Sequence, residues 1–101
     1  MDFSAFPGGE IVCRGLEDLA AGRHSEAALL VLIGAPRLRR LGLVVPERPG
    51  GPAEHRLYEL LAKSNSDSAH SRYNALLRRL VRFERAMECV VYARSERSRH
   101  E

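Results

Sequence analysis

The apolar positions between Asp67 and Tyr92 recur at alternating steps of four and three residues. This spacing places them along one side of an α-helix, which turns once every 3.6 residues. The members of this apolar stripe are Ala69, Tyr73, Leu76, Leu80, Phe83, Met87 and Val90. The pattern predicts a long C-terminal helix whose stripe faces the core of the fold.

Further apolar residues, Leu77, Val81 and Val91, make this face wider than the narrow seam of a coiled coil. A wide apolar face is typical of a helix that packs against several partners in a bundle. We therefore favour a helical bundle and keep an autonomous coiled coil as the alternative.

The predicted length of this helix has a consequence for its far end. About 27 helical residues span about 40 Å, whereas a compact domain of this size is only about 34 Å across. The helix should overhang its own domain, and its apolar residues Met87, Val90 and Val91 predict a subunit contact, most simply in a homodimer. The alternative is that Phe3 and Phe6 fold back over this end.

Shorter helices are predicted in the rest of the chain, and their boundaries carry ordinary stop and start signals. Ser25 is a good N-cap, Pro36 suits the first position of a helix, and Gly22, Gly34 and Gly42 suit helix ends. Residues 43–45 should be extended and buried, 46–52 form a Pro- and Gly-rich loop, 1–9 are a lead-in segment, and 94–101 should fray. The predicted helices cover residues 10–21, 26–33, 36–41 and 53–64.

The pattern as a whole predicts an all-α fold: a small helical bundle of four main helices plus one short helix, in a single domain spanning 1–101. Gly15 lies inside the first helix, where close packing of a neighbouring helix is the usual reason for a glycine. The predicted core consists of Leu16, Leu19, Leu29, Leu30, Ile33, Leu57, Leu60, Leu61, Leu76, Leu80 and Phe83.

The composition bears on the cellular compartment in which the protein is expected. The chain has 101 residues, 45% of them hydrophobic, and no apolar run approaches the ~20 residues that a membrane helix needs. Its first ten residues lack the basic and apolar regions of a signal peptide. Cys13 and Cys89 lie far apart and outside any metal-binding pattern, so we expect two reduced, buried thiols in a cytoplasmic protein.

The net charge of +3 is distributed unevenly along the chain. Residues 1–69 hold eight basic and nine acidic side chains, whereas residues 70–101 hold eight basic and four acidic ones. Five arginines gather opposite the apolar stripe of the long helix. They are Arg72, Arg78, Arg79, Arg82 and Arg85.

Three interpretations of this arginine face remain open. Fifteen of the sixteen basic residues are arginine, which fits a solvated surface that reflects a GC-rich coding background. The same face could contact nucleic-acid phosphates, or it could bind an acidic protein partner. The low aromatic content of 6% gives little support for stacking on single-stranded bases.

A second basic patch is predicted on the short helix, at Arg37, Arg39 and Arg40. With the helix before it, this segment could form a helix-turn-helix that places arginines in a DNA groove. Pro36 and the short length of the second helix oppose this reading. A tight helical corner in the core is the alternative.

Candidate chemistry is sparse. His55, Tyr58, Asp67 and His70 flank one turn, but their positions along the two helices should keep the histidines ~10 Å or more apart along the axis. We therefore predict no catalytic site, no metal and no cofactor. The sequence favours a non-enzymatic helical interaction module, an adaptor or accessory subunit that binds another macromolecule, with nucleic-acid binding through the arginine face as the alternative.

Overall fold

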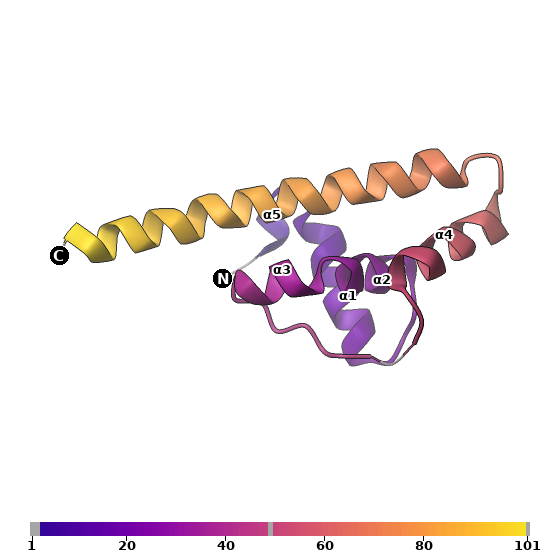
Figure 1. The fold of residues 1–101 in the computed structure, drawn as a ribbon, viewed down its shortest axis with the longest axis horizontal. Coiled ribbons are helices and arrows are strands. Elements are labelled where there is room, and N and C mark those ends of the chain that lie inside the picture. Colours follow the sequence, from indigo (N-terminus) through magenta and orange to yellow (C-terminus); the bar gives the residue numbers. More distant parts are fainter. Residues whose placement is uncertain (1–2, 49, 101) are drawn as a thin grey trace.

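The chain folds as a set of helices packed on one side of a single long C-terminal helix (Figure 1). The computed structural model describes residues 3–48 and 50–100, with side chains up to Arg94. No strand occurs among these residues, which confirms the predicted all-α class of four main helices plus one short helix. The elements are a 3-10 turn Phe3–Ala5, α1 Gly9–Ala20, α2 Glu26–Ile33, α3 Ala35–Arg40, α4 Ala53–Ser64 and α5 Ala69–His100.

The helix ends follow the predicted caps. The side chain of Ser25 accepts a hydrogen bond from the amide of Ala28 at 3.1 Å, which begins α2. Gly22 has φ 76°, and the backbone bonds from Gly22 and Arg23 return to Leu19 and Asp18. This is a Schellman motif, which requires a left-handed residue that glycine supplies without strain.

Helix α2 forms the centre of the fold. Five of its residues, from Ala27 to Val31, are buried, and it packs extensively against both α1 and α4. At its crossing with α1, a Cβ on Gly15 would lie 2.4 Å from the backbone oxygen of Ala27. The predicted close approach at Gly15 is therefore confirmed, and it is what brings α1 and α2 into backbone contact.

Helix α5 covers this core with its apolar stripe. Leu80, Phe83 and Met87 are buried, and the rings of Phe3 and Phe6 lie 6.1 and 6.2 Å from that of Phe83. Seven of the predicted core residues are buried. The other four, Leu16, Ile33, Leu60 and Leu76, are only partly buried and pack against the core from its edge.

The long helix overhangs its domain, as predicted. The molecule measures 53 × 26 × 20 Å, and the end of α5 projects beyond the other helices (Figure 1). The backbone stays helical to His100, past the predicted end near Tyr92, because helix hydrogen bonds need no apolar face. Fraying of residues 94–101 stays a prediction.

The segment between α3 and α4 differs from its prediction. Leu43 and Val45 are buried, but Val44 between them is 87% exposed. Successive side chains of an extended segment point to opposite sides. Only alternate residues could therefore reach the core.

Candidate functional site

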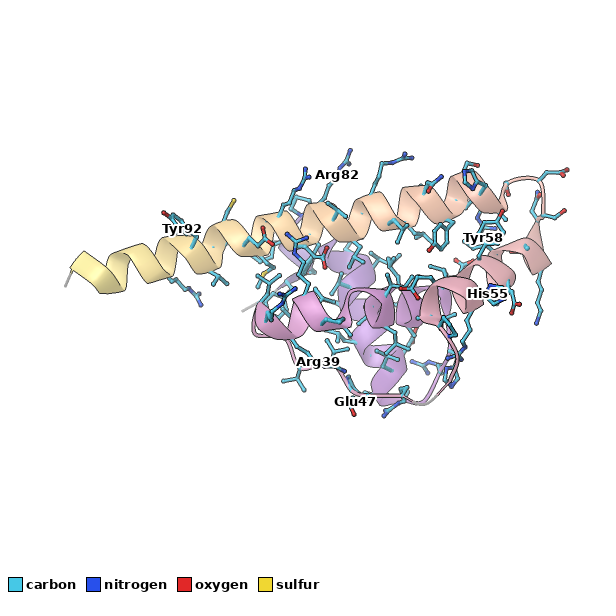
Figure 2. All side chains as sticks on the ribbon, in the orientation of Figure 1. Arg39, Glu47, His55, Tyr58, Arg82 and Tyr92 are labelled. Atoms are coloured by element: carbon cyan, nitrogen blue, oxygen red, sulfur yellow. The ribbon has the colours of Figure 1, made fainter. Side chains whose placement is uncertain are left out.

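Four arginines on the outer face of α5 have no partner in the part of the chain that the structure describes. Arg78, Arg79, Arg82 and Arg85 are exposed and form no ion pair or hydrogen bond with any described residue. We call these four residues the outer basic face. Figure 2 shows Arg82 pointing away from the rest of the molecule.

Arg72 does not belong to this face, although the sequence placed it there. Its guanidinium lies 3.0 Å from a carboxylate oxygen of Glu26 in α2, and it also donates to the hydroxyl of Ser64 at 3.2 Å. Arg72 sits near the start of α5, where the ends of α2 and α4 come within reach. It is thus a structural residue that ties three helices together.

The acidic residues that form ion pairs in the described part of the chain lie away from this face, and Glu10 of α1, which lines a small hollow with Arg79, forms no ion pair with it. Glu88 accepts hydrogen bonds from Arg37 of α3, one of them at 2.7 Å, and Glu84 is buried with Arg37 3.8 Å away. Asp18 is bound by Arg23 and Ser25, and Glu59 by His55. The ion pairs of the described part of the chain therefore leave the outer basic face charged.

The pKa values of two carboxyl groups are shifted by burial and by these contacts. Burial raises the pKa of Glu84, and the positive charge of Arg37 offsets part of that rise. The hydroxyl of Ser25 holds the pKa of Asp18 below its usual range, although burial opposes it. Both groups lie at contacts between helices, and neither forms an ion pair with the outer basic face.

Apolar side chains lie within the same strip of α5. A shallow hollow along this helix is lined by two half-buried residues, Leu77 and Val81, together with polar and basic neighbours. Those neighbours are Asn74, Arg78, Arg82 and Arg85. The strip is therefore amphipathic: it offers a small apolar area beside three guanidinium groups.

The second predicted basic patch is not formed. Arg37 binds Glu88 of α5, whereas Arg39 donates through Nε and Nη2 to the backbone oxygen of Val45. Residues two apart on a helix point in nearly opposite directions, so Arg37 and Arg39 cannot share a face. Only Arg40 remains exposed without a partner among the described residues.

The helix-turn-helix interpretation also loses its support. A single residue, Gly34, separates α2 from α3, and Leu38 at the centre of α3 is fully buried. A recognition helix must present its side chains to a groove. Here α3 is a tight corner of the core, which was the alternative.

The predicted subunit contact is also changed. Met87 is only 4% exposed and packs in the core of its own chain, so it is not part of an exposed surface. Val90 is half-buried, Val91 is 37% exposed and Tyr92 is 67% exposed. The body of the molecule thus reaches one turn further along α5 than expected, and only Val90 and Val91 remain of the predicted contact.

The polar turn between α4 and α5 serves packing. His55 contacts Glu59 at 2.9 Å, and His70 contacts Asn74 at 3.1 Å, so each histidine is engaged within its own helix. The rings of Tyr58 and Tyr73 lie 5.7 Å apart and join the two helices. No group of three or more His, Cys, Asp or Glu side chains in the described part of the chain could hold a metal ion.

The two cysteines are not joined by a disulfide. Cys13 is half-buried, but Cys89 is exposed, which corrects the prediction of two buried thiols. Cys89 lies on α5 just beyond Met87, where the body of the fold ends.

One feature was missed from the sequence. A hollow of about 680 Å³ lies beside α3 and the start of α4, and Arg39, Arg48 and Arg56 line it. Arg39 lies in α3, Arg48 in the loop that follows and Arg56 in α4, and no local sequence pattern predicts that they come together.

No helix in the described part of the chain is long and apolar enough to cross a membrane. Comparison with protein-family models, with curated proteins and with solved structures found no match to this chain.

Proposed function

We propose that this protein is a non-enzymatic helical interaction module, an adaptor or accessory subunit that binds another macromolecule through α5. The observation that supports this is the outer basic face. Neighbouring arginines of this face, such as Arg78 and Arg82, repel each other at a cost of a few tenths of a kcal/mol per pair, and no described acid forms an ion pair with any of the four. A negatively charged partner would supply the missing neutralisation.

The expected partner is an acidic surface of another protein. Leu77 and Val81 lie beside Arg78, Arg82 and Arg85 in the same hollow. An acidic amphipathic helix could place apolar residues on the first two and carboxylates on the arginines, in the helix-in-groove mode of recognition. Phosphates would use only the arginines.

Nucleic-acid binding is the second candidate, and one observation favours it. Arg78, Arg82 and Arg85 are spaced about one turn apart on an exposed helix, which suits contacts to successive phosphates. Neutralising about four phosphates gives a log–log salt slope near −3.6 on duplex DNA. Tight duplex binding with this slope would replace the protein partner by nucleic acid.

The proposal is tested with a matched pair of double variants. Arg78→Gln/Arg82→Gln removes two charges from the outer basic face, and Arg40→Gln/Lys63→Gln removes two exposed charges elsewhere. Fluorescence anisotropy would follow binding to a peptide with glutamate and leucine at helical spacing. We expect the first variant to weaken binding about tenfold or more, since a hydrogen bond to a charged group is worth ~1.5–3 kcal/mol, and the second to change it less than about twofold.

Two results would contradict the proposal. One is equal affinity for the wild type and Arg78→Gln/Arg82→Gln. The other is an equal loss in both double variants, which would show a response to net charge alone.

We further propose that the overhang of α5 supports a symmetric homodimer through Val90 and Val91, with Tyr92 beside them. Sedimentation equilibrium at high micromolar concentration should give twice the chain mass of 11.3 kDa. Val91→Glu should shift the equilibrium to monomer. A wild-type protein that sediments as a monomer would remove the dimer.

We also propose a cytoplasmic location. The exposed thiol of Cys89 supports it, because such a thiol suits a reducing compartment.

A further inference from the structure

We propose that the hollow beside α3 is a binding site for a small phosphate monoester that carries an apolar group. This site lies on a different side of the molecule from the outer basic face, and the proposal does not depend on the interaction described above. Figure 2 shows Arg39 and Glu47 at this site, on the opposite side of the molecule from Arg82.

The size of the hollow suits a small ligand. Its volume of about 680 Å³ lies within the range of small-molecule sites. Leu32, Ala35 and Pro36 form an apolar part of its wall, and the charged residues of the lining are three arginines and one glutamate. A ligand that fits must therefore combine an apolar portion with negative charge.

The guanidinium groups are held in place by neutral acceptors. Arg39 donates through Nε and Nη2 to the backbone oxygen of Val45, at 3.1 and 2.9 Å. Arg48 donates in the same way to the backbone oxygen of Leu19, at 3.2 and 2.6 Å. Bonds of this kind fix the orientation of a guanidinium without cancelling its charge.

Arg56 is held more loosely. Its Nη2 donates to Nδ1 of His24 at 3.0 Å, and its Nη1 lies close to Gly50. None of the three arginines forms an ion pair with a carboxylate in the described part of the chain. This contrasts with Arg23, Arg37 and Arg72, which do.

The balance of charge favours a doubly charged ligand. The lining contains three arginines and one acidic residue, Glu47, which gives it an excess of two positive charges. A phosphate monoester carries about −1.5 to −2 at neutral pH, and its three oxygens accept hydrogen bonds from several guanidinium groups at once. A carboxylate ligand would supply only one charge.

The start of α4 adds to the same field. Ala53 lines the hollow, and the first turn of this twelve-residue helix has no side-chain cap. The partial positive charge of a helix N-terminus favours an anion at that point. The arginines remain the principal recognition groups, and the helix end supplements them.

Isothermal titration calorimetry with phenyl phosphate and with inorganic phosphate tests the site on the full chain. We expect saturable binding of phenyl phosphate with a dissociation constant below about 1 mM. Inorganic phosphate should bind more weakly, because it leaves the apolar wall uncovered. No saturable binding of phenyl phosphate up to about 10 mM would overturn the proposal.

Three variants separate recognition from a general effect on the fold. Arg56→Gln should weaken phenyl phosphate binding about tenfold, whereas Glu47→Gln should tighten it severalfold by removing the only negative charge. Arg40→Gln, an exposed neighbour of Arg39 outside the lining, should change it less than about twofold. Shifts in the same direction for Arg56→Gln and Glu47→Gln, or a tenfold loss in Arg40→Gln, would contradict the site.

Discussion

Replacement of Phe83 by alanine is expected to destabilise the protein by about 3–5 kcal/mol. The ring of Phe83 is fully buried at the centre of α5, and it contacts the rings of Phe3 and Phe6. Its loss would leave a cavity and would also detach the N-terminal segment from the core. Urea denaturation followed by circular dichroism measures the change in unfolding free energy. The total free energy of unfolding of a domain of this kind is only about 5–15 kcal/mol, so this loss is severe.

Tyr92→Ala is the matched control for this experiment. Tyr92 is an aromatic residue of the same helix, but its side chain is 67% exposed, so its loss should change stability by less than about 0.5 kcal/mol. A Phe83→Ala variant within about 1 kcal/mol of the wild type would show that α5 does not pack through this face.

Leu80→Ala is expected to cost about 2–5 kcal/mol. Leu80 is buried where α5 passes the turn between α2 and α3, and both of its terminal methyl groups would lie 3.0 Å from a Cβ on Gly34. The glycine thus makes the notch that Leu80 fills. Removal of the leucine leaves this notch empty.

A double-mutant cycle tests the pairing directly. Gly34→Ala alone should cost about 1–3 kcal/mol, because Leu80 must move, but in the Leu80→Ala background the new methyl group fills part of the cavity. We therefore expect the double variant to be more stable than the sum of the two single effects predicts. Strict additivity would show that Leu80 and Gly34 do not share this contact.

The elements that were predicted well are those with local causes. The bounds of α2 and α4 follow from caps and breakers adjacent in sequence, such as Ser25 and Gly34, which act over a single turn. The stripe of α5 was readable because seven apolar residues repeat the same period. Gly15 was interpretable because close packing is the usual reason for a glycine inside a helix.

The partners of individual arginines were not predictable in this way. Nothing in the sequence distinguishes Arg72 and Arg37 from the other arginines. Yet Arg72 binds Glu26, 46 residues away, and Arg37 binds Glu88, 51 residues away. Such pairs depend on how whole helices cross. The same reason explains Met87: its burial is set by how far the other helices reach along α5.

The two candidate sites differ in the same way: one has a local sequence pattern and the other depends on the tertiary structure. The outer basic face was visible as a helical periodicity, and of the five arginines predicted to form it only Arg72 is engaged in tertiary contacts. The hollow lined by Arg39, Arg48 and Arg56 depends on the path of the chain between α3 and α4. A Pro- and Gly-rich loop gives no periodic signal from which that path could be derived.

Amide chemical-shift mapping of the wild-type protein would show whether the outer face of α5 is the binding surface. Titration with the acidic amphipathic peptide should perturb the amides of residues 74–85 of α5 most strongly, with the side-chain groups of Leu77 and Val81 moving alongside the arginines that flank them. The chemical shifts of amides in α1 and around the hollow beside α3 should not change. Perturbations spread evenly over the basic residues of the chain, or confined to another helix, would contradict a binding surface on the outer face of α5.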